Sequence, residues 1–180
     1  AVGPNPARET SGVDLRGARI ETGRGVAAGT GGSITILGRS PADGRDFNAA
    51  VPVGNSVSGV RLQYLDRTSG HGVFSGAARV DSFAGGAIGI TGDSSGAKSA
   101  ARDGVQILGS TVSGGAGVVT ITGVGGGGDF DADGVLIIAA DFTRTDGAFD
   151  RPAMVETTTG RIAITGSLGS YVSPASNFVD

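Results

Sequence analysis

A short acidic turn carries the residue types that could bind a metal ion. Asp129, Asp131 and Asp133 alternate with other residues and are followed by Gly134. Aspartates at positions 1, 3 and 5 with glycine at position 6 are typical of calcium loops of the EF-hand type, in which the glycine permits a sharp turn. The acid that should close such a loop at position 12 is missing, because Ala140 stands there. The three aspartates are therefore candidate calcium ligands, and the alternative is a carboxylate-rich turn that leads into a strand.

Other catalytic or cofactor chemistry finds little support in the residue types. Cysteine is absent and His71 is the single histidine, so a thiolate site, a histidine metal site and a Ser-His-Asp triad lack their components. The glycine-rich run 123–128 lacks the Gly-Lys-Ser/Thr ending of a phosphate-binding loop. We therefore expect no enzyme and no cofactor other than calcium.

Any site in this chain has to be positioned by a repeated motif, Gly-x-Φ-x-Φ-x-Gly, in which Φ is an aliphatic residue. The motif occurs at Gly32–Gly38, Gly86–Gly92, Gly117–Gly123 and Gly160–Gly166. Its period-2 alternation predicts strands that bury Ile or Val on one face and carry small or hydroxyl residues on the other. We expect the flanking glycines to end each strand in turns with unusual backbone angles.

A second motif, Gly-Val-x-Φ, precedes each of these strands. Its copies start at Gly12, Gly59, Gly104 and Gly134. A competing start at Gly72 is followed by the better-matching continuation Ala78-Arg79-Val80, but Gly59 keeps an aliphatic residue three places on. We favour Gly59. The matching continuations of the other copies are then 18–20, 110–112 and 140–142.

Stacking of these units would bury apolar faces that one unit of about 30 residues cannot bury alone. It predicts three aliphatic columns: Ile34, Ile88, Val119 and Ile162; Ile36, Ile90, Ile121 and Ile164; Val13, Val60, Val105 and Val135. The predicted fold is all-β, a parallel β-helix or solenoid of about four coils over residues 12–166. An irregular segment, 1–11, would precede it, and a tail or the start of another coil, 167–180, would follow. The alternative is an antiparallel β-sandwich.

Three insertions would lengthen the coils. They are predicted as Pro41–Val57, Tyr64–Gly85 and Thr143–Thr159, and their Gly, Asp, Ser and Ala content is typical of exposed loops. Residues 104–133 then form the shortest coil.

Glycoside hydrolysis needs two neighbouring carboxylates, which the predicted stacking does not supply. One outward column contains Asp14, Arg61, Gln106 and Leu136. Another places Asp141 beside Thr111 and Arg19, so that Asp141 is an isolated acid. A polysaccharide-active β-helix enzyme is therefore the least favoured of the functions considered.

Composition excludes several further classes. Glycine accounts for 35 of 180 residues and proline for only 6, which favours short strands with tight turns over helices or collagen. The net charge of −3, without a basic cluster, argues against nucleic-acid binding. No apolar run reaches the length of a membrane-spanning helix. The opening residues do not form a secretory signal, and we expect a fragment or a mature chain cut from a longer protein.

The pairing of Gly-Val-x-Φ with Gly-x-Ile-x-Ile-Thr-Gly over residues 12–166 resembles the repeats of filamentous-haemagglutinin-like proteins and autotransporter passenger domains of Gram-negative bacteria. The resemblance implies a right-handed parallel β-helix, export, and a role in adhesion or as a surface spacer. The amino-terminal secretion domain of that family and a carboxy-terminal membrane barrel are not recognisable in this sequence.

The function that follows from these expectations is a non-catalytic structural or adhesive segment of an exported, extracellular or cell-surface filament. Its partners would be other copies or neighbouring repeats stacked coil on coil, with a host-surface or carbohydrate ligand in addition. The alternative is a calcium-stabilised module that binds carbohydrate or protein.

Overall fold

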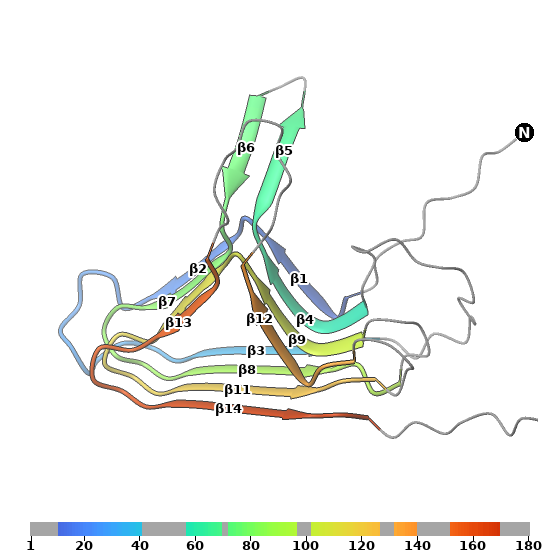
Figure 1. Ribbon diagram of the computed structural model, residues 1–180. Helices are drawn as coiled ribbons and strands as arrows, with labels where there is room; N and C mark the ends of the chain where they lie inside the picture. Colours follow the sequence, from blue (N-terminus) through green and yellow to red (C-terminus); the bar gives the residue numbers. More distant parts are fainter. Residues whose placement is uncertain are drawn as a thin grey trace, which may run out of the picture.

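The computed structural model describes residues 11–40, 57–69, 72–96, 102–126, 132–139 and 152–169. In these residues every regular element is a β-strand, and each coil of the solenoid contributes one strand to each of three sheets. The sheets form the sides of a triangular prism (Figure 1). Neighbouring strands within all three sheets are parallel. The predicted parallel β-solenoid of about four coils is therefore confirmed, and the antiparallel β-sandwich is excluded.

Each sheet contains four strands, one from each coil, in the order of the coils. Sheet A contains β1 (Val13–Arg16), β4 (Val57–Gln63), β9 (Arg102–Leu108) and β12 (Val135–Ile138). Sheet B contains β2 (Arg19–Thr22), β7 (Arg79–Ser82), β10 (Thr111–Ser113) and β13 (Met154–Glu156). Sheet C contains β3 (Ile34–Arg39), β8 (Ile88–Asp93), β11 (Val119–Val124) and β14 (Ile162–Ser167).

The register of these strands is the one that the sequence motifs predict. In sheet C, Ile90 pairs with Ile36 on one side and Ile121 on the other, and Ile121 also pairs with Ile164. The other two predicted columns, led by Ile34 and Val13, are likewise aligned. The aliphatic columns fill the interior of the prism, where Ile90 and Ile121 are both 0% exposed.

The second coil contains an insertion whose placement differs from the prediction. Two strands, β5 (Leu65–Ser69) and β6 (Gly72–Gly76), form an antiparallel hairpin that projects from the corner between sheets A and B (Figure 1). After it the chain returns to the solenoid as β7. The predicted insert Tyr64–Gly85 is therefore too long, because its last part is a strand of sheet B. Gly59 does start the coil, and the continuation first matched to Gly72 belongs to that same coil.

The fourth coil requires a similar correction. Thr111 pairs with Arg79 and with Met154, so the strand of sheet B in this coil is β13. The placement of Asp141 beside Thr111 and Arg19 is wrong, and so is the assignment of all of Thr143–Thr159 to a loop. The chain makes its insertion before this strand rather than after it. Asp141 itself lies outside the described residues, as do residues 1–10 of the predicted end segment 1–11 and residues 170–180 of the predicted end segment 167–180.

The glycines that flank the sheet C strands do not have the unusual backbone angles that were expected. Positive φ occurs elsewhere, for example at Gly17 (57°) and Gly109 (52°), which turn the chain from sheet A into sheet B. The flanking glycines are needed because other backbone atoms approach them closely. At the start of each motif, a Cβ atom on Gly86, Gly117 or Gly160 would strike the carbonyl oxygen of the equivalent glycine one coil earlier.

The closing glycines form a contact between two sheets, which we call the glycine seam. A Cβ atom on Gly92 would strike the carbonyl group of Gly104, and one on Gly104 would strike Gly123. The seam zigzags along the axis in this way through Gly38, Gly59, Gly92, Gly104, Gly123, Gly134 and Gly166. The end of each Gly-x-Φ-x-Φ-x-Gly strand therefore packs on the start of a Gly-Val-x-Φ strand, which explains why both motifs carry glycine at these positions.

Candidate functional site

The outer face of sheet B carries an ordered group of charged side chains in the first two coils. Ile20 of β2 and Val80 of β7 point into the core, so their neighbours along each strand point outward. These neighbours repeat in type: Arg19 pairs in register with Arg79, and Glu21 pairs with Asp81. One guanidinium column and one carboxylate column therefore lie side by side on this face.

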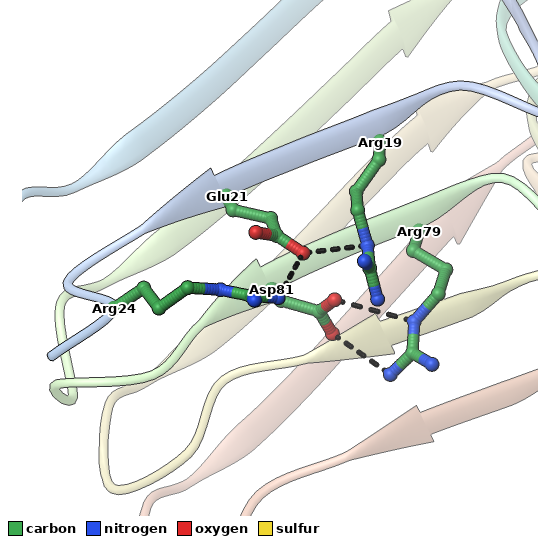
Figure 2. Close-up of polar contacts among 5 residues, drawn as sticks. All are labelled: Arg19, Glu21, Arg24, Arg79 and Asp81. Atoms are coloured by element: carbon green, nitrogen blue, oxygen red, sulfur yellow. Dashed lines mark hydrogen bonds and ion pairs between the residues drawn. The ribbon is translucent and has the colours of Figure 1, made fainter.

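Each arginine binds the carboxylate two residues further along its own strand (Figure 2). Arg19 Nε lies 2.5 Å from Glu21 Oε1. Arg79 Nε lies 3.2 Å from Asp81 Oδ2, and its Nη2 donates to Asp81 Oδ1 at 3.4 Å. Arg24, in the turn after β2, donates from Nη2 to the same Glu21 Oε1 at 3.1 Å. The five residues thus form one cluster, which we call the sheet B cluster.

The cluster is closed at its base and open toward solvent. The side chain of Asp81 is only 2% exposed, whereas those of Arg19 and Arg79 are 51% and 43% exposed. The guanidinium of Arg24 lies 5.1 Å from the ring centroid of Phe83, a cation–π contact, and Phe83 itself remains 48% exposed. The carboxylates therefore fix the arginines, and the arginines and the aromatic ring are presented outward.

The chemistry that this arrangement offers is binding. Both carboxylates are already engaged by guanidinium groups, while both terminal nitrogens of Arg19 and Nη1 of Arg79 make no contact with these carboxylates and can donate hydrogen bonds. Three guanidinium groups meet two carboxylates, an excess of one positive charge on a protein whose net charge is −3. Such a surface can accept an anion or the hydroxyl groups of a neutral ligand.

A second polar group lies on the outer face of sheet A and is buried. Arg61 and Gln106 are 1% and 3% exposed, and Arg61 Nε donates to Gln106 Oε1 at 2.8 Å. Gln106 Nε2 donates to Asp103 Oδ2, and the N–H of Asp133 donates to Asp103 Oδ1 at 2.9 Å. Burial raises the pKa of Asp103 against the opposing effect of these hydrogen bonds. This network links neighbouring coils and contains no open face for a ligand.

The predicted outward column of sheet A has the expected register but not the expected exposure. Asp14, Arg61, Gln106 and Leu136 do align across the four coils. The two central members are covered, although alternation along the strand predicts that they face solvent. Hydrogen bonding between adjacent coils makes this burial possible, because each polar group finds its partner one strand away.

The predicted calcium turn lies only partly within the described residues. Asp129 and Asp131 are outside them, as is His71. Asp133 is exposed and precedes β12, and its backbone serves the contact with Asp103 described above. Among the described residues no group of three His, Cys, Asp or Glu side chains is arranged to hold a metal ion. Calcium binding by Asp129, Asp131 and Asp133 remains a prediction.

The paired acids Glu21 and Asp81 are not among the site residues predicted from the sequence. Residues 78–82 were assigned to a loop, so Asp81 was not aligned with Glu21 in any predicted column. The signal was present, because Arg19-Ile20-Glu21-Thr22 and Arg79-Val80-Asp81-Ser82 share the same pattern of residue types. The correct comparison required that the hairpin be recognised as an insertion between Gly59 and this strand.

Comparisons of the chain with protein-family models, with curated proteins and with solved structures gave no match. In the part of the chain that the structure describes, no helix has the length and apolar character needed to cross a membrane.

Proposed function

We propose that this chain is a structural segment of an exported surface filament, in which successive solenoid units stack coil on coil. The observation that carries the proposal is the open apolar edge of the last described coil. Ile162 and Ile164 continue the core columns, yet they are 41% and 47% exposed, because β14 is the last strand of sheet C in the described part of the chain. Their equivalents in the third coil, Val119 and Ile121, are completely buried.

The first coil is a suitable partner for this edge. Its inward residues are aliphatic at the same positions, so in a second copy Ile162 would align with Ile34, and Ile164 with Ile36, of which Ile34 and Ile36 are already 7% and 6% exposed. Gly32 and Gly38 likewise occupy the positions needed for close backbone contact in the next coil. Stacking would bury the apolar edge and pair the free backbone groups of β3 and β14. The same surfaces would serve neighbouring repeats within one longer chain.

Export and adhesion are the finer parts of the proposal. They are supported by the repeated motifs that resemble filamentous-haemagglutinin-like proteins. The hairpin β5–β6 and the loops between coils would offer the variable contact surface of such a filament.

Sedimentation velocity over a range of protein concentrations tests the stacking. The wild-type chain is expected to form larger species as concentration rises, and electron microscopy should show thin rods. Ile164→Glu places a charge on the apolar edge and should abolish this growth. Thr165→Glu is the matched control, since Thr165 is the next residue but points outward, and it should leave growth intact. A wild-type chain that stays monomeric at all concentrations would refute the proposal.

A further inference from the structure

The guanidinium groups of Arg19 and Arg79 present unused donors side by side. Within the described residues Arg19 makes its ion pair through Nε, so its two terminal nitrogens have no protein partner. Arg79 binds Asp81 through Nε and Nη2, which leaves Nη1. Because the two residues are register partners on adjacent strands, about 4.8 Å separates their backbones. One carboxylate can therefore accept hydrogen bonds from both side chains.

Acceptors and hydroxyl groups adjoin these donors. Glu21 uses Oε1 for both Arg19 and Arg24, and in the described part of the chain its Oε2 accepts no hydrogen bond. On the next coil Thr111 is the register partner of Arg79, and Ser113 that of Asp81; both are partly exposed. A ligand bound here meets donors and acceptors within a few ångströms of one another, as the hydroxyl groups of a sugar require.

An aromatic ring completes the surface. Phe83 follows Asp81 by two residues, and the contact with Arg24 holds one side of its ring in place while 48% of the residue stays exposed. Exposed aromatic rings beside polar side chains are suited to amphipathic ligands, because the ring covers apolar C–H groups while the polar groups are hydrogen-bonded.

We propose that the sheet B cluster, together with Phe83, binds an acidic saccharide. The carboxylate of a uronic acid residue lies between Arg19 and Arg79, a neighbouring hydroxyl donates to Glu21, and a sugar ring packs on Phe83. The excess of positive charge in the cluster favours an acidic sugar over a neutral one. An acidic peptide is less suited, because its carboxylates would oppose Glu21 and Asp81 without supplying hydroxyl donors. The side chains of the site point outward from the first two coils, and β2, which carries Arg19 and Glu21, is the edge strand of sheet B in the first coil.

Calorimetric titration at low ionic strength with a trigalacturonate probe tests the site, with a neutral trisaccharide and triglutamate as comparison ligands. Trigalacturonate is expected to bind best. The double variant Arg19→Gln/Arg79→Gln should bind it at least about tenfold more weakly, because two charge-assisted hydrogen bonds are lost. The control Arg39→Gln removes an exposed arginine of sheet C that pairs with Asp93, and it should bind as wild type does.

Further variants separate the contributions of charge and ring. Circular dichroism shows whether Arg19→Gln/Arg79→Gln folds. If it does not fold, Arg19→Lys/Arg79→Lys gives a second test, because it keeps both charges. Phe83→Ala should weaken binding of trigalacturonate but not of triglutamate. The proposal is overturned if trigalacturonate does not bind, or if the arginine variants bind it as the Arg39→Gln control does. It is also overturned if triglutamate binds as tightly and Phe83→Ala changes neither affinity, since the surface would then recognise charge alone.

Discussion

Gly92 and Gly89 lie three residues apart in β8, and only at Gly92 does another backbone occupy the space that a Cβ atom would need. A Cβ atom on Gly92 would strike Gly104 across the glycine seam, whereas one on Gly89 would meet nothing within 4 Å. Gly92→Ala is therefore expected to lower the free energy of unfolding by about 1–3 kcal/mol through overpacking. Gly89→Ala should change it by less than about 0.5 kcal/mol. Urea denaturation measures both, and equal effects at the two positions would contradict the role assigned to the seam.

The buried carboxyl group of Asp103 should make stability depend on pH. Burial raises its pKa above the ordinary value of 3.8, so the folded protein binds this proton more tightly than the unfolded chain does. The contribution is fully present below pH 3.8 and is lost as pH rises through the folded-state pKa. Asp103→Asn removes the titrating group. The difference in unfolding free energy between wild type and this variant should therefore fall with rising pH across this range and then level off. A difference that rises with pH would show that the hydrogen bonds outweigh burial.

At the scale of elements, the hairpin β5–β6 is an addition to a corner at which the first and third coils each have a glycine, Gly17 and Gly109. Gly17 N–H donates to Gln63 O at the corner of the first coil, and Gly109 N–H donates to Ile138 O in the third. Tyr64 N–H makes the equivalent bond to Leu108 O in the second coil, immediately before the hairpin. The insertion is therefore attached at a standard corner and leaves the sheets aligned on both sides of it.

A deletion tests this independence. Replacing residues 64–77 by one glycine gives Gln63-Gly-Ala78-Arg79, which matches the first-coil corner Arg16-Gly17-Ala18-Arg19. The shortened chain is expected to keep the circular dichroism spectrum of the β-solenoid and a cooperative thermal transition, because the register of β4 and β7 does not depend on the hairpin. Loss of cooperative unfolding would show that the hairpin holds the second coil in place.

At the scale of the whole molecule, stacking of this prism is polar, because the first and last coils are different surfaces. Gly12 N–H donates to Ser58 O in the second coil, and N–H directions alternate along a strand, so the N–H of Val13 points to the free edge. Proline is tolerated at such an edge position but cannot donate to an added strand. Val13→Pro should therefore block the first coil, as Ile164→Glu blocks the last.

The two blocked variants make a specific test of polarity. Each alone is expected to remain monomeric, because head-to-tail growth needs both edges. Mixed in equal amounts, they should form a dimer and nothing larger, since one open edge of each kind remains. Analytical ultracentrifugation of the separate and mixed variants measures this. Dimers of either variant alone would indicate like-to-like contact and contradict the polar arrangement.

The sequence by itself determined the kind of strand, the number of coils and the register of the core columns. Period-2 alternation with aliphatic residues at fixed distances from glycine admits one alignment, because a slip by one residue would turn Ile90 and Ile121 to the outside. Gly59 could be identified as a coil start for the same reason. These are local signals, and stacking preserves them from coil to coil.

Only the tertiary structure decided where the insertions fall and which strands, and so which outward side chains, of sheet B are neighbours across coils. The strand β7 could not be recognised from the sequence because the hairpin β5–β6 separates it from β4. The strand β13 could not be recognised because its sequence, Met154-Val155-Glu156, keeps only the inward valine of the pattern. The cluster of Arg19, Glu21, Arg24, Arg79 and Asp81 depends on the alignment of β7 with β2. The register of Arg61 with Gln106 was predicted from the sequence, but their burial was not. Contacts between coils join residues 45 or more positions apart in these cases, as for Arg61 and Gln106. Their existence depends on the length of every intervening loop, which no local pattern encodes.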